Sequence, residues 1–379
     1  GNGTDSMTES DVQSLLSLVR SALWQIPADD LPDNMNWERV AALASRHTLL
    51  GLVADAAGYL PEPGRPPKPM MIRLFAGRAA GIRAHALINR VLGQVTLLMR
   101  QNGIRPVLLK GQGLALNYPD PLARQCGDID LYIGKKNCRK AYEVAVGKYG
   151  SHETDTENHK HYHVECDGVV VELHKMAEFL PGVVADRKYQ DWTTRHLGGD
   201  SLRQVEIDGC VVELPPVSFD CIYILNHIWH HFINGGIGLR QVCDWTLYLH
   251  RFHGEIDVVQ LRKDLNDFSM MRVWHYFAGI AVKYLGLPEN ECPLYEGLYP
   301  DKSAAVMEII MEEGNFGYYS KTRVGKKPDG YVRGKLHTFK RVTARLWSIF
   351  RIHPTAVMKY YFSFVINGVM SFFKVADED

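Results

Sequence analysis

The chain has 379 residues, of which 46% are hydrophobic and 23% are charged. This length allows two or three domains with sizeable cores, and the composition excludes a disordered or fibrous protein. Lys and Arg together number 43, and Asp and Glu together also number 43. The overall charge therefore gives no reason to expect a nucleic-acid partner, and only local charge can argue for one.

The cysteines and the apolar runs of the sequence predict a compartment. Seven cysteines are scattered without C-x-x-C spacing, and their number is odd. The first residues lack the basic and then apolar pattern of a secretory signal, and no uncharged run reaches the roughly 18 apolar residues that span a bilayer. We therefore expect a cytoplasmic protein with reduced cysteines and no transmembrane segment.

The first 102 residues predict a helical segment. Apolar residues recur at helical spacing over 9–25 and 36–58, with Asn36 as an N-cap. The proline-rich stretch 59–69 predicts an extended connector, and 70–102 predicts one long helix. The arginines of this helix predict a solvated face; they are Arg73, Arg78, Arg83, Arg90 and Arg100.

Two short apolar runs, Val107 to Leu109 and Leu131 to Ile133, predict buried strands. Asp128 and Asp130 are two residues apart beside the second run, so their side chains should project from one face of the sheet. Two adjacent carboxylates repel each other unless a cation lies between them. Mg²⁺ suits this position because it takes one or two carboxylates together with water and substrate phosphates.

The segment between these strands predicts an anion-binding turn. Lys110-Gly111-Gln112-Gly113 stands where the first strand ends, and its glycines allow backbone N–H groups to approach a phosphate. Arg124 adds a fork of donors that matches phosphate oxygens.

Taken together, L-L-K-G-x-G-L, Tyr118-Pro119, Arg124 and G-D-I-D-L-Y-I resemble the polymerase-β-type nucleotidyltransferase superfamily. More narrowly, they resemble the uncharacterised bacterial nucleotidyltransferase 5 family. The resemblance implies an α+β fold, with a small mixed sheet over 103–216 between an N-terminal helical segment, 1–102, and a C-terminal helical domain, 217–379. It also implies an NTP substrate, Mg²⁺ or Mn²⁺, and nucleotide contacts from Lys110, Gly111, Gln112, Arg124 and Gly127.

Beyond a helix expected at 135–148, residues 151–175 alternate with period two. Asp167-Gly168 predicts a hairpin turn, followed by the strand GVVVELH. The resemblance implies a third carboxylate on this strand, and Glu172 occupies its position. Glu172 would hold metal with Asp128 and Asp130 and help to activate the attacking hydroxyl.

Histidines suggest two further metal hypotheses. His159, His161 and His163 alternate on one predicted strand, which fits either a zinc site or, as we favour, a polar sheet face. His227 and His231 are spaced i, i+4 on a predicted helix without a third ligand, so we expect them to line the core or the substrate pocket.

Two short strands are expected within 180–216, around Val205 and at 211–214, and helices after them. Arg240 and Asp244, four apart, predict a pair on a helix surface. The basic tract 321–351 suits phosphate, nucleic acid or an anionic surface. The apolar stretch 355–373 predicts a helix docked on the core, or alternatively an interfacial membrane helix.

The expected reaction is Mg²⁺-dependent transfer of a nucleoside monophosphate from NTP to an acceptor hydroxyl, with a small-molecule acceptor favoured over RNA or protein. One alternative is a decayed enzyme that binds nucleotide for regulation, because the Gly-Ser of the superfamily is here Gly111-Gln112. Another is a toxin-like nucleotidyltransferase that acts on RNA or protein, which the basic tract would favour.

Overall fold

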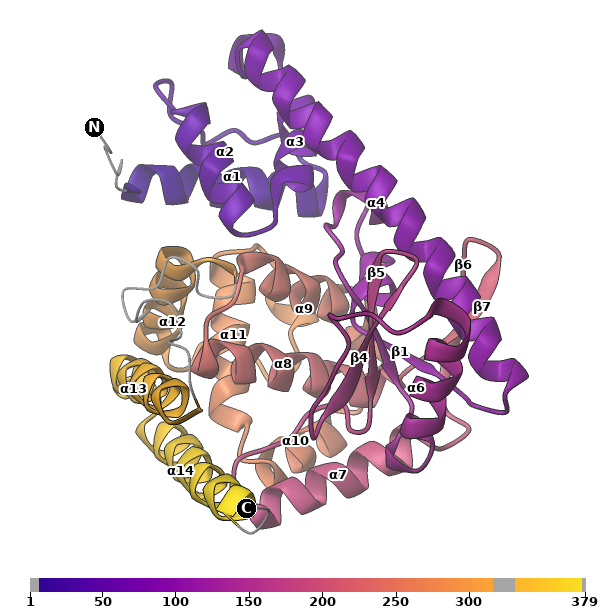
Figure 1. Ribbon diagram of the computed structural model, residues 1–379. Coiled ribbons are helices and arrows are strands. Elements are labelled where there is room, and N and C mark those ends of the chain that lie inside the picture. Colours follow the sequence, from indigo (N-terminus) through magenta and orange to yellow (C-terminus); the bar gives the residue numbers. More distant parts are fainter. Residues whose placement is uncertain (1–6, 316–330, 377–379) are drawn as a thin grey trace.

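The computed structural model describes residues 7–315 and 331–376, and Figure 1 shows their arrangement. The N-terminal helices are α1 (Glu9–Trp24), α2 (Trp37–Arg46) and α3 (Leu50–Tyr59). Asn36 caps α2 as predicted, because its side chain accepts a hydrogen bond from the backbone N–H of Arg39. The helical pattern predicted over 36–58 forms two helices, α2 and α3, because the chain breaks at Thr48, whose φ of 57° lies in the left-handed region.

Helix α4 (Lys68–Gln101) confirms the long helix and runs from the N-terminal helices along the sheet (Figure 1). The connector before it contains a 3₁₀ turn, Glu62–Gly64. The prediction that the arginines of this helix are all solvated is wrong at Arg78. This side chain is buried, with its Nε 3.1 Å from Asp55 Oδ1 and a second ion pair to Asp120.

In the described part of the chain, seven strands form one mixed sheet of order β3-β4-β5-β2-β1-β7-β6. The strands β1 and β7 are parallel, as are β2 and β5, and the other neighbours are antiparallel. Their bounds are β1 Val107–Leu109, β2 Ile129–Tyr132, β3 Thr156–Glu157, β4 His161–Cys166, β5 Val169–His174, β6 Arg203–Ile207 and β7 Cys210–Leu214. The hairpin turn is confirmed, since Asp167 and Gly168 join β4 and β5 with φ of 48° and 80°.

The two faces of the sheet have different surroundings. One face packs Leu108, Ile129 and Val171 against α4 and α6 (Lys135–Tyr149). The opposite face carries Asp130 and Glu172, since side chains alternate along a strand, and it looks toward the C-terminal helices. The sheet thus has a buried apolar side and a side that lines a pocket.

The helices after the sheet lie on the side of this second face, and the first two of them line its pocket. They are α8 (Val217–Asn234), α9 (Leu239–Phe252), α10 (Val258–Asp267), α11 (Met271–Lys283) and α12 (Pro300–Glu313). A further helix, α7 (Val183–Leu197), lies in a region where only strands were predicted. It buries Tyr189, which meets Phe268 edge to face, and Trp192, which stacks on Phe219. One hydrophobic core joins α1, α3, α8, α9, α11 and α12, and the division at residues 102 and 216 stays a prediction.

The last two helices, α13 (Tyr331–Ile349) and α14 (Pro354–Ala376), lie on the outer side of α8 and α12 (Figure 1). In the predicted basic tract, Lys321, Arg323, Lys326 and Lys327 lie outside the described residues. Arg345 of that tract is not available to a partner, because it is buried and ion-paired with Glu313. Among the helices over 7–315 and 331–376, none combines the length and apolarity needed to cross a bilayer.

The α+β expectation is therefore confirmed: a mixed sheet is flanked by helical segments on both sides in sequence.

Candidate active site

The turn after β1 places a lysine over the sheet. Lys110 has φ 53° and ψ −141°, and Gly111, with φ 46°, begins the short helix α5 (Gly111–Ala115). A non-glycine residue in this region is strained, and such strain gathers at functional sites. The Lys110 Nζ lies 3.3 Å from Asp130 Oδ1 and 3.3 Å from His227 Nε2. The turn thus directs an ammonium group at the strand carboxylate.

Three carboxylates gather in front of this lysine. Asp130 on β2 is paired in register with Glu172 on β5, and Asp128 directly precedes β2. One oxygen from each of Asp128, Asp130 and Glu172 can be chosen so that all lie within 4.8 Å of one another. Parallel pairing of two strands accounts for the close approach, because it sets residues of equal register side by side.

The two aspartates have opposite electrostatic surroundings. Burial opposes a charge on Asp130, but the ammonium of Lys110 and a hydrogen bond from His174 outweigh it and hold its pKa well below the usual value. The charge of Asp130, together with burial, raises the pKa of Asp128, which faces the open pocket. Asp130 is thus held in its charged form, whereas the charged form of Asp128 would be stabilised by an added cation.

His174, at the end of β5, was not among the predicted site residues. It is 1% exposed, and its Nε2 lies 2.9 Å from Asp130 Oδ1 and 3.2 Å from Glu172 Oε2. Burial lowers the pKa of His174, but the bonds to these carboxylates more than compensate and raise it. The sequence could have indicated His174, because it is two residues after Glu172 on the predicted strand and residues i and i+2 of a strand share a face.

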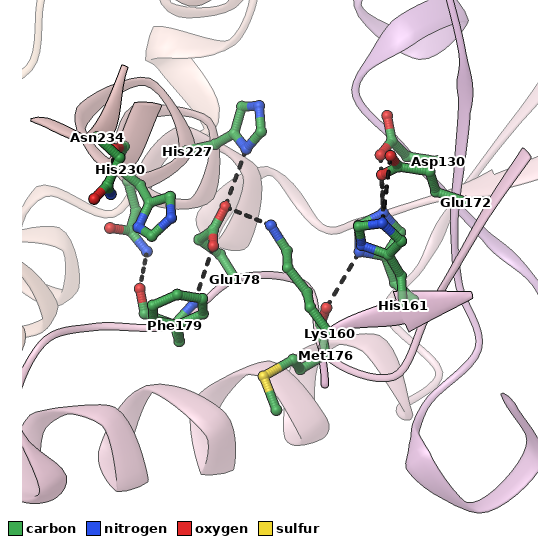
Figure 2. Close-up of polar contacts among 12 residues, drawn as sticks. Asp130, Lys160, His161, Glu172, Met176, Glu178, Phe179, His227, His230 and Asn234 are labelled. Carbon is green, nitrogen blue, oxygen red and sulfur yellow. Dashed lines mark hydrogen bonds and ion pairs between the residues drawn. The ribbon is translucent and has the colours of Figure 1, made fainter. Parts of the chain in front are cut away.

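A second charged network lies behind Lys110. Glu178, which follows β5, is completely buried between Lys160 Nζ at 2.9 Å and His227 Nδ1 at 3.1 Å (Figure 2). Burial raises the pKa of Glu178, but Lys160 and the neighbouring histidines hold it well below its usual value. Burial, followed by the charge of Lys110, lowers the pKa of His227.

The neutral ring of His227 accepts from Lys110 and donates to Glu178, so this chain of contacts fixes the lysine. The prediction that His227 and His231 line the core or the pocket is confirmed, since both are on the pocket wall.

These groups surround a pocket of about 350 Å³ between the sheet, α8 and α9. Of the predicted residues, Gln112 does not line it: its side chain is buried, with neither amide atom hydrogen-bonded within the described structure. The lining includes the remaining predicted residues and several that were not predicted: Thr48, Lys110, Gly111, Arg124, Gly127, Asp128, Asp130, Lys160, His161, Glu172, His227, His231, Arg240, Asp244 and Asn315.

Arg124 has a partner that the sequence did not indicate. Its Nε and Nη2 lie 2.7 and 2.8 Å from the two carboxylate oxygens of Asp244, and Tyr118 donates to the same group at 2.7 Å. The predicted surface pair of Arg240 and Asp244 is therefore wrong, because Asp244 is buried on Arg124. Arg240 instead donates to the carbonyl of Gln125.

The chain was compared with known protein families and solved structures. The family described as "Uncharacterised nucleotidyltransferase" matches residues 33–286, about two thirds of the chain. The chain belongs to this family. The antigenic nucleotidyltransferase-like protein from Paracoccidioides brasiliensis, known from a crystal structure, is similar at 16% identity and a TM-score of 0.32, over 52% of this chain and 92% of that chain. No curated protein matches the chain.

For a nucleotidyltransferase, the three carboxylates fit a divalent cation. Their clustered oxygens are the hard ligands that Mg²⁺ and Mn²⁺ take, and the raised pKa of Asp128 reflects unbalanced negative charge. Asp128, Asp130 and Glu172 are the residues that would hold the ion.

Proposed function

We propose that this protein transfers a nucleoside monophosphate from an NTP with bound Mg²⁺ or Mn²⁺ to an acceptor hydroxyl. The observation that carries the proposal is the convergence of Asp128, Asp130 and Glu172 at the mouth of a pocket that also contains basic side chains. Family membership supports the general activity. The nucleotide, the metal and the acceptor are parts of the proposal.

The reaction forms one bond and breaks one bond. The acceptor oxygen bonds to the α-phosphorus, the bond from that phosphorus to the bridging oxygen of the β-phosphate breaks, and pyrophosphate leaves. The acceptor proton passes to Glu172, the half-buried carboxylate beside Asp130. A bound divalent ion supplies charge neutralisation for the triphosphate.

The remaining pocket residues have different roles in binding the triphosphate. Lys110 directs its ammonium toward Asp130, and Gly111 and Gly127 line the pocket without a Cβ that would exclude a phosphate. Arg124 lines the same pocket, but its fork is occupied by Asp244. We therefore assign it the positioning of the loop that leads to Asp128, and we assign phosphate contact to Arg240.

Arg240 suits this role because one part of its guanidinium is free for a ligand. Its Nη1 donates to the Gln125 carbonyl, while its buried Nε has no hydrogen-bond partner in the described structure. A phosphate oxygen would satisfy such a donor with a charge-assisted bond. Burial, together with the charge of Arg124, lowers the pKa of Arg240, so an added anion would stabilise its charge.

The acceptor is best described as a small molecule. The pocket of about 350 Å³ is closed on one side by Ile224, His227 and Ile228 of α8. A partly enclosed volume of this size suits a compact ligand. RNA or protein would have to present a narrow end group to reach Glu172.

The test is pyrophosphate release from each of the four NTPs with Mg²⁺ or Mn²⁺, in the presence of a small-molecule extract and of separated RNA and protein fractions. We expect release that depends on the metal and on the small-molecule fraction. Metal-dependent NTP binding without transfer would support the decayed, regulatory alternative. Label found in RNA or protein would support the toxin-like one.

A further inference from the structure

Two histidines extend the carboxylate cluster on one side. His161, on β4, and His174, on β5, are paired in register, and both flank Glu172. Each of His161, Glu172 and His174 offers a ligand atom within 4.8 Å of the other two. This group differs from the three alternating histidines expected from the sequence, because His159 and His163 are not part of it.

The distances within this group are those of ligands around a metal ion. His174 Nε2 lies 3.2 Å from Glu172 Oε2, and His161 Nε2 lies 3.5 Å from Glu172 Oε1. With metal–ligand bonds near 2.1 Å, neighbouring ligand atoms are about 3.0 to 3.4 Å apart in octahedral or tetrahedral sites. The side chains therefore need little rearrangement to share one ion.

A hydrogen bond on the far side of the His174 ring orients its two nitrogens. The Nδ1 of His174 faces the backbone carbonyl of Met176 at 3.3 Å, so a neutral ring carries its hydrogen there and its lone pair at Nε2. In this structure Nε2 carries the hydrogen that bonds to Asp130, and a metal ion would take the place of that hydrogen, because the lone pair left behind points at the carboxylates of Asp130 and Glu172. Two electron-pair donors this close require a proton or a metal ion between them.

His161 contacts Asn158 through Nε2 itself, whereas its Nδ1 is buried without a hydrogen-bond partner in the described structure. The Asn158 Oδ1 accepts from the backbone N–H groups of Lys160 and His161 at 2.8 Å each, which fixes the amide orientation. Its Nδ2 therefore donates toward His161 Nε2, at a long 3.4 Å, so that this nitrogen carries a lone pair. A metal ion would replace this weak contact.

We propose that His161, Glu172 and His174 form a second metal position beside the one held by Asp128 and Asp130, with Glu172 shared between them. Imidazole nitrogen combined with carboxylate oxygen favours a first-row transition ion such as Mn²⁺, Co²⁺ or Zn²⁺ over Mg²⁺, which prefers oxygen alone. The ion at this position is bound by the protein without nucleotide. The inference therefore goes beyond the proposed transfer activity and does not require it.

The experiment measures Mn²⁺ binding to the full-length, chelator-treated protein, without nucleotide, by pulsed electron paramagnetic resonance. We expect coupling between bound Mn²⁺ and imidazole nitrogen in the wild type. His161→Gln and His174→Gln should each weaken the nitrogen coupling and raise the Mn²⁺ dissociation constant at least about tenfold. His159→Gln and His163→Gln are the matched controls on the same strand region and should bind as the wild type does.

Other outcomes would overturn the inference. They are Mn²⁺ coordinated by oxygen alone, no Mn²⁺ binding, or a nitrogen signal that survives both substitutions. Because His174 is deeply buried, circular dichroism must show that its variant folds. If the His174 variant is unfolded, the result for His161→Gln tests the proposed metal position, since the His161 side chain is 16% exposed.

Asp128→Asn separates the two positions and the two proposals. It should retain the nitrogen coupling, whereas loss of the coupling would place the ion on the aspartates instead. If bound Mn²⁺ shows nitrogen coupling but the protein releases no pyrophosphate with any NTP, the proposed transfer activity is wrong and the second metal position is supported.

Discussion

Arg124 and Asp244 form a buried, bidentate ion pair between residues 120 positions apart in the sequence, and each side chain is only 4% exposed. The pair ties the loop before Asp128 to α9, which forms one wall of the pocket. Its geometry makes this arginine a structural anchor of the site.

Breaking this pair should destabilise the fold strongly. Asp244→Ala leaves the Arg124 guanidinium buried without a counter-charge, so we expect a loss of about 3–5 kcal/mol in the free energy of unfolding. Urea denaturation measures it. The double variant Arg124→Met/Asp244→Leu should recover much of the loss, and Lys263→Met, at an exposed ion pair, should have almost no effect. A small loss in Asp244→Ala would contradict the anchoring role.

Asp128→Asn should separate ligand binding from stability. The charge of Asp130 raises the pKa of Asp128, so ionised Asp128 opposes folding at neutral pH. The variant should therefore melt at the same or a slightly higher temperature while losing Mg²⁺-dependent NTP binding in calorimetry. Equal NTP affinity with and without Mg²⁺ in the wild type would argue against the metal site.

Glu172→Gln should remove turnover more than binding. It keeps the size of the side chain but removes the charge that accepts the acceptor proton, a loss that typically slows reactions by about 10²–10⁴-fold. Pyrophosphate release should fall by this factor, with a much smaller change in Mg-NTP affinity. Glu165→Gln, on the neighbouring strand β4 and outside the pocket lining, is the control. Full activity in Glu172→Gln would exclude Glu172 from the mechanism.

Arg240→Met should weaken triphosphate binding. A charge-assisted hydrogen bond contributes about 1.5–3 kcal/mol, which corresponds to roughly 10- to 100-fold in affinity. We expect calorimetry to show this loss for Mg-NTP and almost none for the nucleoside. Arg139→Met, on the far side of the sheet in α6, should bind both ligands normally. If NTP affinity is unchanged in Arg240→Met, phosphate contact belongs to Lys110 and the backbone of the turn.

His47 should make the fold sensitive to acid. It is fully buried, accepts a hydrogen bond from the backbone N–H of Leu239 at Nδ1 and contacts the Met311 carbonyl through Nε2. Burial lowers its pKa to about 4, whereas the unfolded chain takes up the proton near 6.5. The unfolded state therefore binds more protons between these values, and stability should fall by about 3 kcal/mol as pH drops from 6.5 to 4.

Denaturation at several pH values measures this dependence. His47→Asn keeps an acceptor for Leu239 but cannot titrate, so it should be less stable at neutral pH and have a shallower slope between pH 6.5 and 4. Identical slopes for the variant and the wild type would assign the acid sensitivity to other buried histidines.

Local chemistry in the sequence determined the elements and the centre of the site. The cap at Asn36, the turn at Asp167-Gly168 and the long helix α4 depend on neighbouring residues, and all three form as predicted. Asp128 and Asp130 were identifiable from strand alternation. Glu172 was placed through the family resemblance, and the parallel pairing of β2 with β5 brings it beside Asp130.

Only the tertiary structure decided the partners of the charged side chains. The sequence predicted a solvated Arg78 and a phosphate-binding Arg124, and it gave no indication of a role for Glu178. Each is buried because a counter-charge arrives from another part of the chain: Asp55, Asp244 and Lys160, respectively. The neutral ring of His227 adds a hydrogen bond to Glu178. Burial of a charge depends on such a partner, and the spacing of neighbouring residues carries no information about contacts that form across 18 to 120 positions.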